Sequence, residues 1–205
     1  MHNPLQPESW LEELQMVLSR VECRVGNQSV HKEQGFLALE QRLLEVRASD
    51  CTVWWVGNGG SAAICSHLSQ DMLNKLKLRS MSLNDSSLMT CMSNDFGYAN
   101  VFKRPLEILA NKGDLLIAIS SSGNSENIAV CAELARKKGM HLVTLSGFHQ
   151  NNLLWTGKND IAFYLPASLY GIVEVGHEAL LHAVIETLFL KEQGIHSVKQ
   201  EKQDS

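Results

Sequence analysis

The chain has 205 residues, of which 44% are apolar and 20% are charged, and its formal net charge at pH 7 is −4. This length and balance predict one globular domain with a substantial core. They give no support to a nucleic-acid-binding or membrane-binding surface, because both need an excess of basic side chains.

The cysteines and the N-terminus indicate the cellular setting. The five cysteines are scattered, and no two have the C-x-x-C spacing: Cys23, Cys51, Cys65, Cys91 and Cys131. This usage is typical of reduced thiols in a cytosolic protein. The segment 1–13 has no apolar signal core, and no run approaches the length of a membrane span. We therefore expect a cytoplasmic protein without a membrane segment.

In chain order, residues 1–50 are predicted to form helices with apolar stripes, which serve the core or a contact between subunits. Residues 51–192 then repeat the order strand, glycine loop, helix, and residues 193–205 form a polar tail. The predicted strands are 52–57, 79–83, 114–119, 141–145 and 160–165. The predicted helices of this part are 61–75, 86–93, 98–110, 125–138 and 173–191. Such alternation predicts an α/β fold with a parallel sheet, in which ligands bind at the carboxyl ends of the strands.

Two short runs at the predicted strand ends are the strongest signals in the chain. Residues 57–61 read Gly-Asn-Gly-Gly-Ser after an apolar strand, and residues 120–125 read Ser-Ser-Ser-Gly-Asn-Ser after another. Glycines let the backbone expose its N–H groups, serine hydroxyls add donors, and a following helix N-terminus favours negative charge. Two such loops in one small domain indicate a phosphorylated ligand held from two sides.

Each loop also has other interpretations. Residues 57–62 match the G-x-G-x-x-A form of the dinucleotide fingerprint, with Asp85 as the acidic residue, but this hypothesis leaves the second loop unexplained. A nucleotide P-loop is disfavoured because no Gly-Lys-Ser/Thr closes either run. Either loop alone could also be a tight strand-to-helix turn with a serine N-cap.

Titratable residues gather on two predicted helices. His67 and Asp71 lie four residues apart, which puts them on one helix face, where they can share a divalent ion. A second group lies within nine residues of a largely apolar segment: Glu174, His177, Glu178 and His182. By spacing alone, the same-face pairs in this group are Glu178 with His182 or Glu174 with His177.

Three motifs in this order resemble the sugar isomerase (SIS) family, and most of all its phosphoheptose isomerases: residues 57–61, Asn94-Asp95-Phe96-Gly97, and residues 119–125. The resemblance covers about residues 30–190. It implies a three-layer α/β/α sandwich with a five-stranded parallel sheet, assembled as a homotetramer with active sites between subunits. It also implies isomerisation of sedoheptulose 7-phosphate to D-glycero-D-manno-heptose 7-phosphate through a cis-enediolate, an early step toward the heptose of bacterial surface polysaccharide.

The resemblance carries site roles onto matching residues. The divalent metal, expected to be Zn²⁺, would be held by His67, Asp71, Glu174 and His182. Asp71 would move the proton between C1 and C2, and His182 the oxygen-bound proton. The substrate would contact Asn58, Gly59, Gly60, Ser61, Asn94, Asp95, Glu174 and the serines Ser120, Ser121, Ser122 and Ser125. For Glu174 and His182 to reach one ion, either their side chains must converge or the helix must begin after Glu174, because a continuous helix separates them by roughly 12 Å.

The sequence departs from the family pattern at three positions. Asp71 stands where the family has a glutamate, Glu174 where it has a glutamine, and Gly171 where an acidic residue is common. Two alternatives therefore stay open beside the isomerase: a non-catalytic SIS module, such as the tetramer that assists a replication initiator, and an isomerase of another phosphosugar. The loss of one methylene at position 71 favours the binding module, whereas the retained His67 and His182 favour the enzyme.

Overall fold

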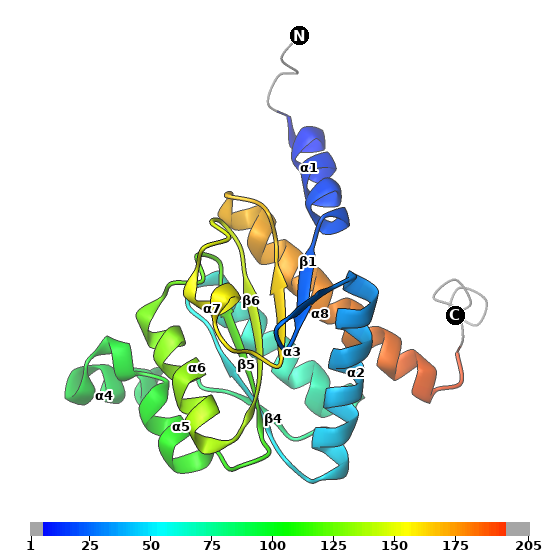
Figure 1. Cartoon of the computed structure of the whole chain (residues 1–205). Helices are drawn as coiled ribbons and strands as arrows, with labels where there is room; N and C mark the ends of the chain where they lie inside the picture. Colours follow the sequence, from blue (N-terminus) through cyan, green and yellow to red (C-terminus); the bar gives the residue numbers. More distant parts are fainter. Residues whose placement is uncertain (1–5, 196–205) are drawn as a thin grey trace.

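The computed structural model describes residues 6–195 and has one mixed sheet as its centre (Figure 1). The spatial order of the strands is β2-β1-β7-β6-β5-β3-β4. Five strands are mutually parallel: β3 (Val53–Val56), β4 (Ser80–Ser82), β5 (Leu115–Ser120), β6 (His141–Ser146) and β7 (Ile161–Tyr164). The hairpin of β1 (Glu22–Val25) and β2 (Gln28–Val30) adds antiparallel to β7.

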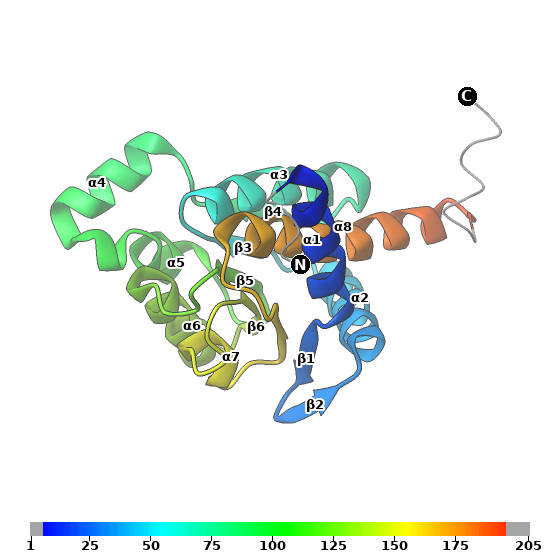
Figure 2. The ribbon, with the colours of Figure 1, turned by 90° about the horizontal axis from the view of Figure 1, so that it is seen from above.

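Helices cover both faces of this sheet (Figures 1 and 2). One face carries α2 (Lys32–Ala48), α3 (Gly60–Lys75) and α8 (Tyr170–Glu192), with α1 (Pro7–Ser19) packed on α8. The other carries α5 (Lys103–Leu109), α6 (Glu126–Lys138) and α7 (Leu153–Thr156). The helix α4 (Ser86–Phe96) projects from the rest of the molecule in both views. The 3₁₀ turn η1 (Tyr98–Asn100) follows it and connects it to α5. The arrangement is a three-layer α/β/α sandwich.

The strands divide the core into two apolar layers, because successive side chains point to opposite faces. On β3, Val53 and Trp55 pack toward α3 and α8, whereas Trp54 and Val56 pack toward α5 and α6. All six residues of β5 are buried. This central strand ends at the serine loop, so the loop leaves from the most constrained part of the sheet.

The predicted five-stranded parallel sheet and sandwich are confirmed, and every predicted strand is observed within two residues of its expected bounds. Residues 1–50 were predicted to hold only helices, which is wrong for the β1–β2 hairpin. Its Gly26-Asn27 turn is typical of two-residue hairpin loops, and Gly26 has a φ of 56°. The predicted tail falls outside the described residues beyond position 195. In the described part of the chain, no helix is long and apolar enough to cross a membrane.

Candidate active site

A cavity of about 260 Å³ opens where β3 and β5 end. Three segments line it: the first glycine loop, the serine loop and the start of α8. The lining residues include nine of the predicted ligand-binding positions together with Tyr170: Asn58, Gly59, Gly60, Ser61, Ser120, Ser121, Ser122, Ser125, Tyr170 and Glu174. The two loops that the sequence singled out therefore face one ligand-sized space, as their positions at the strand ends predicted.

The serine loop is held in a defined conformation by its own hydrogen bonds. The Gly123 N–H donates to the Ser120 carbonyl at 2.9 Å, and the Ser120 and Ser125 hydroxyl oxygens lie 3.0 Å apart. Gly123 has a φ of +66°, and a Cβ there would lie 2.0 Å from Asn152 Oδ1, so glycine is required. Because α6 begins directly after Ser125, the loop joins hydroxyl donors to a helix N-terminus, an arrangement that suits an anion.

The first glycine loop is fixed by the side chain of Asn58. Its Oδ1 accepts from the Tyr98 hydroxyl and from Asn127 Nδ2, each at 2.8 Å, and its Nδ2 donates to Asn127 Oδ1 at 2.9 Å. Because these hydrogen bonds hold the Asn58 side chain, the backbone of residues 59–61 faces the cavity.

Gly60 allows Glu174 of α8 to approach this loop. A Cβ at position 60 would lie 2.5 Å from Glu174 Cδ, so only glycine leaves room for the carboxylate. Gly60 and Glu174 also line an adjoining pocket together with His67 and Glu178. The two spaces therefore adjoin along the line where α3 and α8 meet.

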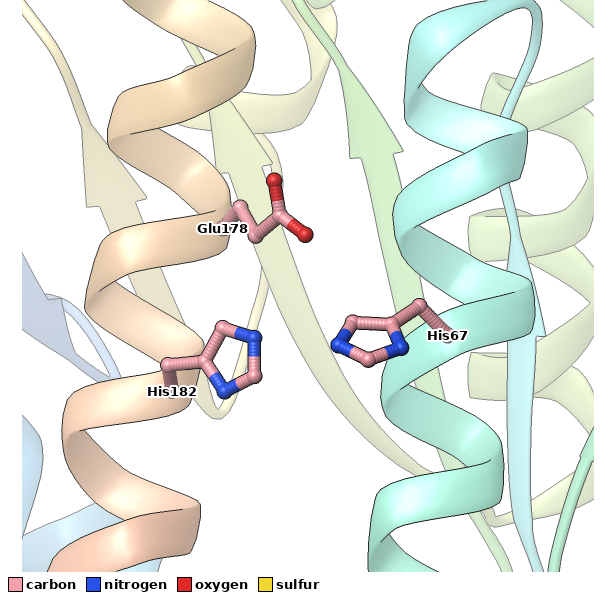
Figure 3. Close-up of side chains that lie close together, drawn as sticks. All are labelled: His67, Glu178 and His182. Atoms are coloured by element: carbon pink, nitrogen blue, oxygen red, sulfur yellow. The ribbon is translucent and has the colours of Figure 1, made fainter.

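Three residues that could bind a metal cluster at that adjoining pocket: His67 and Glu178 line it, and His182 lies close to both. Figure 3 shows His67 on α3 facing Glu178 and His182 on α8. One ligand atom from each of the three lies within 4.8 Å of the others, and the two imidazole centroids are 5.1 Å apart. In the described part of the chain, the His67 and Glu178 side chains form no hydrogen bond or ion pair, so their ligand atoms are free.

Asp71 lies one helical turn beyond His67 and belongs to a second group. Its carboxylate is 5% exposed and accepts from Lys75 Nζ at 3.0 Å, and Lys75 also pairs with Glu186. His182 Nδ1 lies 3.8 Å from Asp71 Oδ2 and 3.9 Å from Glu186 Oε1. The hydrogen bonds that Lys75 donates to Glu186 and Asp71 raise its pKa, so it stays protonated. Asp71 is thus already paired with a cation.

His177 is directed away from this cluster. It is fully buried, and its Nε2–H donates to the Ser146 carbonyl at 3.1 Å. Burial lowers its pKa to about 4, so the imidazole is neutral at physiological pH. Within residues 6–195, His177 Nδ1 has no partner, as is also true of the buried hydroxyls of Ser121 and Ser146. His177 is a core residue beneath the serine loop, not a ligand of the cavity.

The structure separates the predicted site residues into groups. Helix α8 is continuous from Tyr170, so the hypothesis that it begins after Glu174 is wrong. Glu174 lines the cavity but is not in the close group of His67, Glu178 and His182. Of the two same-face pairs that the spacing left open, Glu178–His182 is the one that lies close to His67.

The predicted substrate residues Asn94 and Asp95 lie on the projecting helix α4. Both are exposed, and Asn94 Nδ2 donates to Asp95 Oδ1 at 2.8 Å. Neither lines the cavity within this one chain, and their role stays a prediction. The segment still connects to the first glycine loop, through the bond from Tyr98 to Asn58.

Comparison with known proteins places this fold and cavity in a family. The SIS domain matches residues 19–147, which include both glycine-serine loops but not α8. The chain therefore belongs to the SIS-domain family.

Two similar proteins and one similar solved structure are phosphoheptose isomerases. A phosphoheptose isomerase of Cytophaga hutchinsonii is 40% identical over 136 residues, which is 63% of this chain and 70% of that protein. Another, of Akkermansia muciniphila, is 36% identical over 140 residues, or 65% and 73% of the two chains. The structure of phosphoheptose isomerase from Neisseria gonorrhoeae matches with a TM-score of 0.77 and 24% identity, over 88% of this chain and 95% of that one.

Proposed function

We propose that this chain is a sugar-phosphate isomerase that interconverts sedoheptulose 7-phosphate and D-glycero-D-manno-heptose 7-phosphate. One observation carries the proposal: the cavity under the serine loop adjoins a pocket lined by His67 and Glu178, whose ligand atoms lie close to His182, and Gly60 and Glu174 line both spaces. A phosphate at one end thus puts the sugar chain beside imidazole and carboxylate groups at the other. The phosphoheptose isomerase relatives support the choice of substrate.

The serine loop is the proposed phosphate site. The Ser120 hydroxyl lies within hydrogen-bonding range of the Ser122 and Ser125 hydroxyls, so these three groups could together donate hydrogen bonds to a phosphate. The N-terminus of α6 adds a favourable dipole. The backbone of residues 59–61 and the carboxylate of Glu174 would contact the sugar hydroxyls.

The donor set of the adjoining pocket fits a divalent ion such as Zn²⁺, because two imidazoles and a carboxylate are typical zinc ligands. Bound there, the ion would polarise the sugar carbonyl. In this proposal His182 would move the oxygen-bound proton. The transfer of a proton between C1 and C2 needs a base, and the sequence predicted Asp71 for this role.

A non-catalytic phosphosugar-binding protein is the second candidate. The observation in its favour is that Asp71 is buried and already paired with Lys75, which lowers its availability as a base.

Turnover of sedoheptulose 7-phosphate by the purified protein separates the two candidates. We expect wild type to form the aldose, and His182→Ala to lose at least about 100-fold in kcat, as is usual for a general acid–base group. His149→Ala is the matched control, because His149 is exposed and outside the cavity. Absence of turnover together with measurable binding of the sugar phosphate would favour the binding protein. Turnover of other ketose phosphates but not of sedoheptulose 7-phosphate would show an isomerase with a different substrate.

Three further properties belong to this proposal. Zinc is the proposed ion. A homotetramer is the proposed assembly, supported by exposed apolar side chains beside the cavity such as Leu169 and Tyr170. The cytoplasm is the proposed location, supported by five free cysteines. Metal analysis and light scattering of the purified protein test the first two.

A further inference from the structure

Two carboxylates compete for the place beside His67 and His182, and they differ in what they already bind. Asp71 accepts from Lys75 at 3.0 Å and is 5% exposed. Glu178 is partly exposed and, within residues 6–195, has no hydrogen bond or ion pair. A ligand must offer a free lone pair, and removing a carboxylate from a cation in a low-dielectric site is costly. The free carboxylate is therefore the better ligand.

The orientation of His182 supports the same assignment. Its Nδ1 faces Asp71 and Glu186 at 3.8 and 3.9 Å, and its ring lies beside His67 and Glu178 on the other side (Figure 3). Histidine ligands of metals generally direct their second ring nitrogen to a carboxylate, which fixes the tautomer and the ring orientation. Asp71 occupies the position of this supporting carboxylate.

The side-chain length at position 71 agrees with the supporting role. His67 and Asp71 lie one turn apart on α3, and Lys75 lies one turn further, where it bridges Asp71 to Glu186 of α8. An aspartate is one methylene shorter than a glutamate, so its carboxylate stays near Lys75 instead of extending toward His67. Glu178, one turn before His182 on α8, reaches into the pocket from the opposite helix.

Resting on the proposed function, we propose that Glu178 is the carboxylate ligand of the divalent metal site, together with His67 and His182. Asp71, Lys75 and Glu186 form a supporting layer that orients His182. The site thus takes its carboxylate from α8, and the aspartate at position 71 is a positioning residue.

Binding of Co²⁺ to the purified full chain tests this assignment with a readout other than activity. Calorimetry gives the affinity, and the visible d–d absorption of Co²⁺ reports the ligand set. We expect Glu178→Gln to weaken Co²⁺ binding more than about 100-fold and to change the spectrum. Asp71→Asn should weaken binding by only about 10- to 100-fold, the usual effect of losing a supporting partner, and should keep the spectrum.

A matched control and a folding measurement keep the test decisive. Glu192→Gln makes the same chemical change on the same helix, about 21 Å along its axis, and should bind Co²⁺ as wild type does. Glu178→Gln removes no side-chain hydrogen bond or ion pair within residues 6–195 and relieves repulsion from Glu174, so its melting temperature without metal should be no lower than that of wild type. Glu178→Gln with wild-type affinity and spectrum would overturn the proposal, as would Asp71→Asn with an altered spectrum.

Turnover measured on the same preparations keeps this inference separate from the proposed function. Wild type that converts sedoheptulose 7-phosphate while Glu178→Gln keeps its metal refutes the ligand assignment and leaves the isomerase standing. Wild type that binds Co²⁺ through Glu178 but converts no heptose phosphate supports the ligand assignment and refutes the substrate. Wild type that binds no divalent ion overturns the metal site itself.

Discussion

A buried carboxylate at the start of β5 supplies a stability prediction that is independent of the active site. Asp114 is 3% exposed and accepts three hydrogen bonds. Its Oδ1 accepts from the Thr52 N–H at 2.9 Å, and its Oδ2 accepts from Trp54 Nε1 at 2.9 Å and from the Asn111 N–H at 2.8 Å. The carboxylate thus joins the first strands of the parallel sheet, and Asp114→Asn changes its charge without changing its shape.

The expected loss of stability in Asp114→Asn follows from the number of hydrogen bonds that the side chain can still accept. An amide has one oxygen, so in its better orientation it still accepts from Trp54 and Asn111 and turns its NH₂ toward Thr52. One charge-assisted hydrogen bond, worth about 1.5–3 kcal/mol, is then lost, and two others fall to about 0.5–1.5 kcal/mol each. Allowing for the lower cost of burying a neutral group, we expect a loss of about 3 kcal/mol in the free energy of unfolding.

Urea denaturation at pH 7 and fixed protein concentration measures this loss, with Asp160→Asn as the matched control. Asp160 accepts from the Leu142 N–H at 2.7 Å, but its side chain is 43% exposed, so we expect a loss of about 1 kcal/mol or less. A loss for Asp114→Asn no larger than that for Asp160→Asn would refute the reasoning, because burial and acceptor count would then not govern the cost.

Two further predictions concern packing and thiol reactivity. Gly176→Ala should lower the free energy of unfolding by about 1–3 kcal/mol, because its Cβ would lie 2.1 Å from Leu165 Cδ2 in the core. Gly171→Ala on the same helix, where the Cβ meets only an ordinary contact at 3.5 Å, should instead raise it by about 0.5–1 kcal/mol. Cys91 is exposed, and the charge of Asp95 raises the pKa of its thiol. Alkylation of Cys91 at pH 8 should therefore be faster in Asp95→Asn than in wild type, and equal rates would contradict the influence of this carboxylate.

The parallel sheet could be predicted because its strands carry their signal locally. Residues 115–119 form a continuous apolar run, and the structure buries all of them. The β1 strand lacks such a signal, since only Cys23 of its four residues is buried. It is held by pairing with β7, which lies more than a hundred residues away in the chain. A short strand fixed by a distant partner leaves little trace in its own sequence.

The same distinction between local and distant interactions explains what could be predicted of the site. The glycine-serine loops are local features of strand ends, and the structure places both around one cavity. The cluster of His67, Glu178 and His182 depends on how α3 packs along α8. Helical spacing puts Glu174, Glu178 and His182 on one face of α8, but only the packing decides which of them meets His67. Neither the sequence of α3 nor that of α8 determines by itself how the two helices are aligned along each other.

The charges along the contact between α3 and α8 give a physical reason for a cation there. Lys75 balances Asp71 and Glu186 at one end. At the other end, Glu174 and Glu178 line one pocket, and neither forms an ion pair within residues 6–195.

Where the phosphoheptose isomerase pattern has a neutral glutamine, Glu174 adds a second negative charge to this pocket. Two nearby carboxylates repel each other unless a cation or a proton intervenes, so the substitution would favour the proposed divalent ion beside His67. The departure from the family pattern at position 174 and the ion pair at position 71 therefore act together: the first concentrates negative charge at the His67 end, and the second removes Asp71 from it.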